Sequence, residues 1–294
     1  MRFNLPVLVY QEKNCVHNHA DEIAQMGKNA LIVTGRNSSK KNGSLDDVIN
    51  ALKSKNIKYT VYDGVEENPS VETVMEAREI GVKAGCDFII GIGGGSPMDA
   101  AKAIGVMIYH KNENKDFLYK SVSNSQSLPV IEVPTTCGTG SEVTTVAVLT
   151  VHNEKTKKSM SHRIFPRMAL VDEKYIKNAP LKVICDTAID ALAHIVESCI
   201  NNNATEYSKM FAKEGLEAWS KFKDVLLGNR EATDEDFHNM MYASTLAGMC
   251  IAHAGTSLPH GLSYPITYEL GIPHGKAVGY FLPGYINEAT DEDK

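Results

Sequence analysis

Short apolar runs alternate with helical stretches over roughly residues 28–150, and this alternation constrains the fold more than any other feature. The apolar runs have the length and residue types of buried strands, and they cover Ala30–Thr34, Lys58–Tyr62, Asp87–Ile92 and Leu128–Val133. Helical spacing lies between them, at Leu45–Leu52, Ser70–Gly85 and Pro97–Tyr109. Buried strands separated by helices predict a doubly wound α/β domain, with a parallel sheet covered by helices on both faces.

The second half of the chain has a different pattern of apolar residues. After Asp172 the strand signal almost disappears, and apolar stripes at helical spacing follow at Val183–Asn201, Thr205–Leu227 and Thr233–Ala254. We therefore predict an α/β domain over residues 1–178 and an all-helical domain over residues 179–294. The segments Val143–Val151 and Lys158–His162 are predicted to form a hairpin appended to the sheet.

Composition excludes several classes of function. The 294 residues carry a net charge of −6 that is spread along the chain, which argues against a nucleic-acid-binding protein. No uncharged apolar run approaches the length of a membrane span, and the first residues lack the apolar core of a signal peptide. The six cysteines form no CxxC pair and are typical of reduced thiols. We expect a cytoplasmic enzyme or a soluble binding protein.

A glycine-rich turn follows the third predicted strand, in the segment Gly91–Asp99 (GIGGGSPMD). Consecutive glycines let a ligand approach the backbone, while Ser96 suits an N-cap and Pro97 the first helical position. The free N–H groups of the first helical turn form an anion site suited to a pyrophosphate. A tight turn without a ligand is the alternative, but a phosphate-bearing cofactor is favoured.

A second polar loop, Pro134–Glu142 (PTTCGTGSE), follows the next predicted strand. The carboxyl ends of parallel strands share one sheet edge, where ligands of open α/β sheets bind. The hydroxyl groups and glycines of this loop could line the nicotinamide, ribose and phosphate of a dinucleotide.

The helical half contains a possible metal-ligand set. Asp190 and His194 are four residues apart, so they lie on one helix face, close enough to share a cation. A solvent-facing polar pair is the alternative for these two residues alone. His260 and His274 each stand in a Pro-His-Gly sequence. One carboxylate and three imidazoles suit a divalent ion such as Fe²⁺ or Zn²⁺, which could polarise a carbonyl group for hydride transfer.

With these motifs in order, the chain resembles the iron-containing (group III) alcohol dehydrogenases. The resemblance rests on Glu67-Asn68-Pro69, Gly93–Lys102, Pro134–Thr144, Asp190-x-x-x-His194, and His260 with His274. It implies a dehydroquinate synthase-like fold, a nucleotide domain followed by a metal domain, and an active site in the cleft between them. It also implies a small alcohol or aldehyde substrate and a homodimer, with neither nucleic acid nor membrane as a partner.

The resemblance assigns residues to roles. Asp190, His194, His260 and His274 would be the metal ligands. Gly94, Gly95 and Ser96 would hold the pyrophosphate. Other cofactor contacts would come from Asn37, Ser38, Asn68, Asp99, Thr135, Thr136, Thr139, Thr144 and Lys158.

Two departures from the family pattern bear on the chemistry. Many members have a second histidine four residues after the third ligand, where this chain has Tyr264. With a pKa of about 10, tyrosine is a poor proton relay near neutral pH, so Tyr264 either shapes the substrate pocket or packs, and no general acid or base is assigned. After the first nucleotide strand, Gly35 and the basic loop Arg36–Lys41 replace the acidic residue of NAD-preferring members. This loop favours NADP(H) over NAD(H), unless it is simply a solvated surface loop.

Family chains continue through several helices beyond the segment that here ends at Lys294, so the chain is either a natural short form or incomplete. The leading prediction is a metal-dependent oxidoreductase that transfers a hydride between NADP(H), or NAD(H), and a small primary alcohol or aldehyde. A lyase of the dehydroquinate synthase type, using metal and NAD internally, is one alternative. A truncated protein that binds nucleotide or metal without turnover is the other.

Overall fold

The computed structural model describes residues 3–289, and the chain divides into two compact units. The α/β unit comprises Pro6–Thr135 and Thr145–Tyr175. Among the described residues, the helical unit comprises Phe3–Leu5, Thr136–Thr144 and Ile176–Ala289. The loop Thr136–Thr144 is thus grouped with the helical unit, although it lies between two segments of the α/β unit in the sequence.

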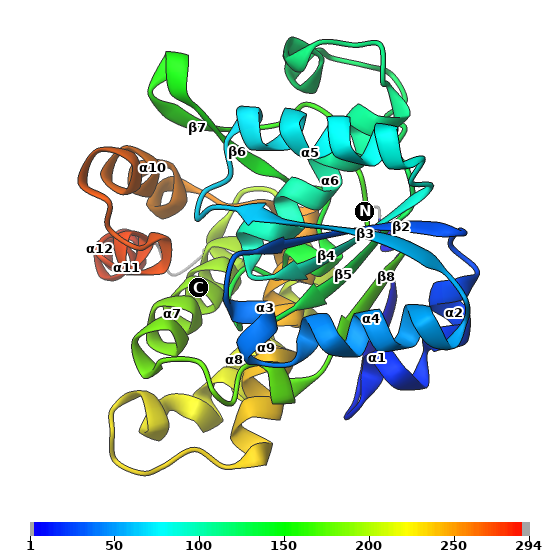
Figure 1. Ribbon diagram of the computed structural model, residues 1–294. Coiled ribbons are helices and arrows are strands. Elements are labelled where there is room, and N and C mark those ends of the chain that lie inside the picture. The colour runs from blue at the N-terminus through cyan, green and yellow to red at the C-terminus, as the bar shows by residue number, and fades with distance from the viewer. Residues whose placement is uncertain (1–2, 290–294) are drawn as a thin grey trace. The chain divides into compact units, whose positions relative to one another are not determined.

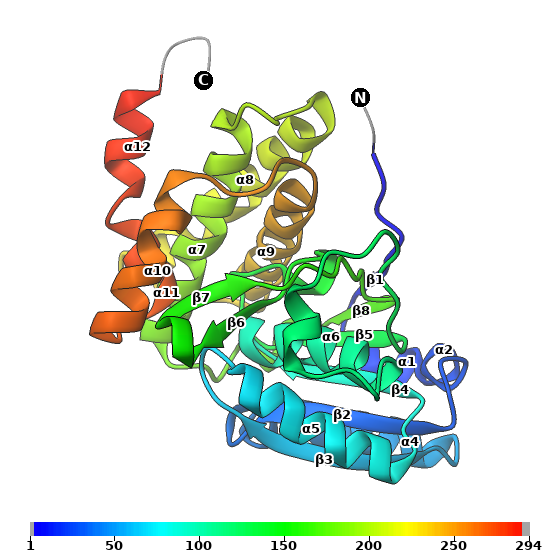
Figure 2. The same cartoon turned by 90° about the horizontal axis from the view of Figure 1, so that it is seen from above.

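The α/β unit is built on a six-stranded sheet in the order β1-β8-β5-β4-β2-β3 (Figures 1 and 2). All neighbouring strands run parallel. The strands are β1 (Leu8–Gln11), β2 (Asn29–Gly35), β3 (Lys58–Val65), β4 (Phe88–Gly93), β5 (Val130–Pro134) and β8 (Met168–Val171). The predicted parallel sheet and the helical second half are both confirmed.

Helices cover both faces of this sheet, as Figure 1 shows. Along β2, Leu31 and Val33 pack in one core with α5 (Val71–Ala84) and α6 (Gly95–Tyr109). The alternate residues Ala30 and Ile32 pack in the other core. That core also takes side chains from α1 (Cys15–Asn18), α2 (Ala20–Ala24) and α4 (Ser44–Ser54). Every side chain named on β2 is fully buried, which explains its continuous apolar sequence.

The order of the strands reverses between β2 and β4. From β2 the chain passes to β3 on one side, while β4, on the other side, leads to β5. Thr34 of β2 pairs with Ile92 of β4, so both strands end at the same place along the sheet. Ligands of open α/β sheets bind at such switch points, outside the carboxyl ends of the strands. The loop after β2 and the glycine turn after β4 therefore flank the position where a nucleotide is expected.

The predicted hairpin is present but shorter and not part of the main sheet. It consists of β6 (Val148–Val151) and β7 (Thr156–Ser159), paired antiparallel in a sheet of two strands. The first strand starts later than predicted because Ser141–Val143 form a 3-10 turn, η2. Strands β1 and β8 were not predicted. Each has only four residues, and β1 is partly exposed at the sheet edge, so neither stands out from the surrounding sequence.

The helical unit contains α7 (Leu181–Ile200), α8 (Glu206–Leu226) and α9 (Asp234–Ala254), close to the predicted bounds. These helices pack against one another, and Figure 2 shows them together. Three shorter helices were not predicted: α10 (Leu258–Leu270), α11 (His274–Gly279) and α12 (Leu282–Glu288). Prolines at or near the starts of all three, and Pro265 inside α10, obscure the helical pattern in the sequence. In the described part of the chain, no helix is long and apolar enough to cross a bilayer.

Two long helices of this unit begin with reciprocal caps. In α9 the hydroxyl of Thr233 accepts the N–H of Asp236, whose carboxylate in turn accepts the N–H of Thr233. Arg230 donates to both carboxylate oxygens of Asp236. That guanidinium, aided by Thr233, holds the pKa of Asp236 below its ordinary value. Trp219, the only tryptophan of the chain, joins α8 to α7 by donating to the carbonyl of Ala188 at 2.7 Å.

We expect Asp236→Asn to destabilise the helical unit by about 1 kcal/mol at neutral pH, the usual size of a helix cap. Because the pKa of Asp236 is lower in the folded state, the stabilisation exists above its ordinary pKa of 3.8 and is lost as pH falls below it. Urea unfolding followed by Trp219 fluorescence at several pH values measures this. The matched control is Glu235→Gln, which removes an exposed charge from the same turn. Equal losses in the two variants, or a loss that persists at low pH, would contradict the assignment.

Candidate metal centre and nucleotide-binding loops

The four predicted metal ligands converge in the helical unit. Helix α7 contributes Asp190 and His194, one turn apart, α10 contributes His260, and α11 begins at His274. From Asp190 Oδ1, the Nε2 atoms of His260, His274 and His194 lie at 3.4, 3.7 and 4.0 Å. All of these residues are buried except His274, which is partly exposed.

The arrangement fits a metal ion. Ligand atoms bound about 2.1 Å from a metal lie roughly 3 to 4 Å from one another, and the distances from Asp190 Oδ1 to the three imidazoles fall in this range. The ligand atoms of Asp190, His260 and His274 all lie within 4.8 Å of one another, whereas His194 lies outside this closest group. Asp190 Oδ1 and His260 Nε2 are buried and make no hydrogen bond. Buried polar atoms without partners are rare, and a cation between them would satisfy both.

In each of the three imidazoles, the Nδ1 atom lies close to a polar group of the protein. Nδ1 of His194 lies 3.2 Å from the carbonyl oxygen of Gly138, and Nδ1 of His274 lies 3.4 Å from the hydroxyl of Ser263. Nδ1 of His260 lies 2.5 Å from Glu197, a residue that the sequence analysis missed. Glu197 follows Asp190 by seven residues and His194 by three, so it continues the same helix face. That spacing was visible in the sequence and could have revealed it.

Burial and charge oppose each other in this cluster. Burial alone would raise the pKa of the Asp190 carboxyl, but the surrounding histidines outweigh it and hold that pKa below its ordinary value. Burial lowers the pKa of His194, which favours the neutral imidazole that binds metals. Burial would also lower the pKa of His260, but Asp190 and Glu197 together raise it to about 9. A carboxylate and a neutral imidazole are therefore ready for a cation, while His260 holds a proton that a metal must displace.

The glycine after His274 has a packing role. A Cβ on Gly275 would lie 1.8 Å from the carbonyl oxygen of Asp186 and 3.2 Å from the Cβ of Asp190. Only glycine lets α11 approach α7 closely enough to bring His274 to Asp190. The glycine after His260 differs, because a Cβ on Gly261 would meet nothing within 4 Å. Beside the cluster, the ring of the half-buried Tyr264 has its centroid 5.9 Å from that of His274.

In the α/β unit, the glycine turn leads directly into α6. The helix begins at Gly95 with Gly94 as N-cap, so the predicted cap at Ser96 is wrong. The Ser96 hydroxyl instead accepts the N–H of Asn68 at 3.0 Å, which ties the turn to the loop after β3. No side chain caps α6, and Gly94, Gly95 and Ser96 are partly exposed beside buried neighbours. Gly93 has φ +150°, a conformation that L side chains rarely adopt. The N-terminus of α6 is thus open to an anion.

The other predicted cofactor residues have varied surroundings. Thr135 donates its N–H to the carbonyl of Gly93 at 2.8 Å, next to the glycine turn. Asp99 accepts the N–H of Val148 and so anchors β6 to α6. Lys158 of β7 lies 3.4 Å from Glu154 and over the ring of Tyr119. The remaining residues of the PTTCGTGSEVT loop, Thr136, Thr139 and Thr144, belong to the helical unit.

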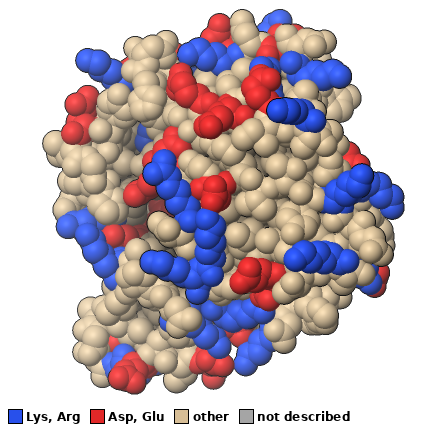
Figure 3. Space-filling view, in the orientation of Figure 1, with Lys and Arg blue, Asp and Glu red and all other residues tan. Residues whose placement is uncertain are grey.

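The basic loop after β2 is largely exposed. Asn37 and Ser38 open the short helix α3 (Ser38–Lys41), and both are exposed, as are Arg36 and Lys41. Lys40 is paired with Asp63 at 2.5 Å, and this ion pair is the main cause that lowers the pKa of Asp63. The charge of Arg36 also helps to lower the pKa of Asp63, whereas Lys41 forms no ion pair with a carboxylate of the described residues. Across the face in Figure 3, acidic side chains are interspersed with basic ones.

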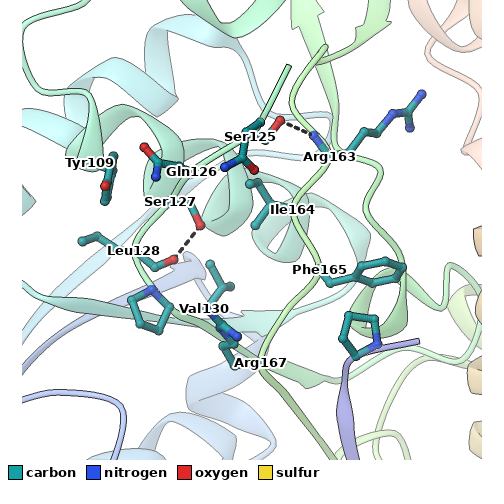
Figure 4. Close-up of a pocket in the computed structure, with 13 residues that line it drawn as sticks. Tyr109, Ser125, Gln126, Ser127, Leu128, Val130, Arg163, Ile164, Phe165 and Arg167 are labelled. Atoms are coloured by element: carbon teal, nitrogen blue, oxygen red, sulfur yellow. Dashed lines mark hydrogen bonds between the residues drawn. The ribbon is translucent and has the colours of Figure 1, made fainter. Parts of the chain in front are cut away.

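A cavity of about 370 Å³ lies elsewhere in the α/β unit, at the amino-terminal ends of β5 and β8. Its lining includes Tyr109, Gln126, Val130 and Arg167, and Figure 4 shows the side chain of Arg163 extending away from the other labelled residues. None of the predicted metal or cofactor residues lines this cavity. It lies at the opposite ends of the strands from the glycine turn.

Comparison with known proteins agrees with this geometry. The family model described as iron-containing alcohol dehydrogenase matches residues 6–173, and the C-terminal model of the Fe-containing alcohol dehydrogenase family matches residues 184–294. The chain belongs to the iron-containing alcohol dehydrogenase family. Proteins of this class are metal-containing oxidoreductases that interconvert alcohols and aldehydes with NAD(P).

Individual relatives support the same assignment. A long-chain primary alcohol dehydrogenase of Thermoanaerobacter ethanolicus is 32% identical over 88% of this chain, and the match covers 65% of that enzyme. An NADPH-dependent butanol dehydrogenase of Clostridium saccharobutylicum is also 32% identical, over 96% of this chain and 72% of its own length. The crystal structure of an iron-containing alcohol dehydrogenase from Thermotoga maritima has a TM-score of 0.92 and 40% identity, covering 97% of this chain and 78% of that one.

We expect excess Zn²⁺ to stabilise metal-free protein, because a ligand that binds only the folded state stabilises it by about 2.7 kcal/mol at 100 times its Kd. His260→Ala should abolish this shift in the unfolding midpoint of Trp219 fluorescence. The matched control is His253→Ala, since His253 stacks on Phe3 in the same unit and lies outside the ligand cluster. If His260→Ala retained the full shift, the ligand assignment would be wrong.

Proposed function

We propose that this chain is a metal-dependent oxidoreductase that transfers a hydride between NADP(H) and a small primary alcohol or aldehyde. The observation that carries the proposal is the convergence of three imidazoles on Asp190 Oδ1, with buried ligand atoms that lack hydrogen bonds. We further propose that the chain acts in the cytoplasm as a homodimer. The outer strands β1 and β3, each paired on one side only in the sheet, offer edges for association.

Asp190, His194, His260 and His274 would hold the metal, with Fe²⁺ favoured by the family and Zn²⁺ compatible with the donor set. A divalent ion there supplies Lewis-acid chemistry, which polarises a carbonyl and stabilises negative charge on the alcohol oxygen. The chain's own residues would hold the ion, while hydrogen bonds at Nδ1 orient the rings of His194 and His260 and burial would exclude water. No residue is assigned as general acid or base.

The cofactor would bind at the switch point of the sheet. The exposed start of α6 would take the pyrophosphate through Gly94, Gly95 and Ser96. Further contacts are proposed for Asn37, Ser38, Asn68, Asp99, Thr135, Thr136, Thr139, Thr144 and Lys158. NADP(H) is favoured over NAD(H) because Arg36 and Lys41 are both exposed near the end of β2. One curated relative is NADPH-dependent by name.

A dehydroquinate synthase-like lyase is the alternative from the sequence. The long-chain, butanol and propanediol dehydrogenases and the lactaldehyde reductase among the relatives favour the dehydrogenase. Net consumption of nicotinamide separates the two, since a lyase that uses NAD internally consumes none.

We expect protein purified without oxygen and loaded with Fe²⁺ to oxidise NADPH with at least one small aliphatic aldehyde, measured by absorbance. His260→Ala should lose this activity while retaining NADPH binding, because His260 is not among the proposed cofactor residues. Metal-free protein should fall to the background rate and recover on adding the ion. Absence of turnover with either Fe²⁺ or Zn²⁺ across an aldehyde panel would overturn the proposal.

We expect Lys41→Ala to raise the KM for NADPH about tenfold, the loss of one charge-assisted contact to a phosphate, with little change for NADH. Lys53→Ala removes an exposed lysine from α4 and serves as the control. Parallel changes in the KM for both nucleotides would show that Lys41 does not contact a 2′-phosphate.

A further inference from the structure

Glu197 is a fully buried carboxylate in the helical unit, with 0% relative exposure. It lies on α7, one turn beyond His194, and both of its oxygens have partners. Oε1 is 2.5 Å from Nδ1 of His260, and Oε2 accepts the backbone N–H of Ser257. Ser257 immediately precedes α10, the helix that carries His260. The carboxylate therefore fixes both the histidine and the start of its helix.

The hydrogen bond determines which nitrogen of His260 can bind a metal. An ionised carboxylate only accepts hydrogen bonds, so Nδ1 of His260 must carry the proton that faces Glu197. In the neutral ring the lone pair then lies on Nε2, the atom 3.4 Å from Asp190 Oδ1. Metal-bound histidines commonly donate their other N–H to such a partner, which fixes the tautomer and raises the basicity of the ligand.

Glu197 also differs from the partners of the other two histidines. Gly138 offers a backbone carbonyl to His194, and Ser263 offers a hydroxyl to His274, so neither brings a charge. Of these three contacts, the one with Glu197 comes from an ionisable side chain, and His260 is almost completely buried between Glu197 and Asp190. With a metal bound and the imidazoles neutral, Asp190 and Glu197 would carry the charge that balances a divalent ion.

We propose that Glu197 is the positioning residue of the metal centre: it holds His260 in the tautomer and orientation that bind the ion, and its charge helps to balance that ion. The inference rests on the proposed metal-dependent function. Glu197 itself is not a ligand in this assignment, because its oxygens face Nδ1 of His260 and the Ser257 N–H.

The test is a titration of metal-free protein with Co²⁺, followed by visible absorption and by competition with a chelator. Glu197→Gln keeps the size of the side chain but removes its charge. We expect this variant to bind Co²⁺ about 10- to 100-fold more weakly than the wild type, with a changed absorption spectrum. Asp236→Asn is the matched control, because it removes another buried carboxylate of the helical unit that contacts no ligand histidine. Its Co²⁺ affinity should stay within about twofold of the wild type.

The outcomes separate the two proposals. If the wild type binds no Co²⁺, the metal-dependent function fails. If the wild type binds but Glu197→Gln retains its affinity and spectrum, only the role of Glu197 fails. Equal weakening in Glu197→Gln and Asp236→Asn would also overturn that role, because it would reflect general loss of structure.

A second measurement needs no variant of Glu197. In wild-type protein with ¹⁵N-labelled histidine and bound Zn²⁺, long-range ¹H–¹⁵N spectra report which ring nitrogen carries a proton. We expect His260, assigned through His260→Gln, to be protonated at Nδ1 with a strongly downfield proton. A His260 ring that lacks the Nδ1 proton would refute the proposal even if Glu197→Gln failed to fold.

Discussion

The helical unit is organised around the burial of one carboxylate, Asp190, which is 2% exposed. Removing a charged group from water costs several kcal/mol unless partners compensate it. Here the compensation comes from imidazoles on α7, α10 and α11, so these helices must meet at one point. Gly275 permits one of these approaches, at the contact between α11 and α7. The same requirement that stabilises the carboxylate thus brings together the ligand set.

Much of this organisation could be predicted from the sequence, because local patterns encode it. Continuous apolar strands separated by helices predict a parallel sheet. A strand that is buried on both faces does not alternate between apolar and polar residues. The four-residue spacing of Asp190 and His194 placed them on one helix face, and the Pro-His-Gly repeats singled out His260 and His274. The glycine turn was recognised, although Gly94 caps α6 where Ser96 had been expected.

What could not be predicted depends on tertiary contacts or on conflicting local signals. Helix α10 contains Pro265, which normally argues against a helix, yet the helix carries His260. Strands β1 and β8 are too short to show a pattern, and their pairing joins residues more than 150 positions apart. Glu197 and His260 are 63 residues apart in the sequence, so no local motif predicts their hydrogen bond. The helical spacing predicts only that Glu197 lies on the same face of its helix as Asp190 and His194.

The two candidate sites use the chain in different ways, and this explains their different dependence on single residues. At the start of α6 an anion would meet backbone N–H groups, which any residue with the right conformation supplies, so glycines matter there for shape. The metal centre depends on histidine side chains. Their rings are oriented by contacts of Nδ1 with a carbonyl, a hydroxyl and a carboxylate. Of these only the carboxylate adds charge.

Without a metal, the raised pKa of His260, about 9, lets a proton offset part of the charge of Asp190 and Glu197. A divalent ion would balance the charge of both carboxylates, and its binding would release that proton.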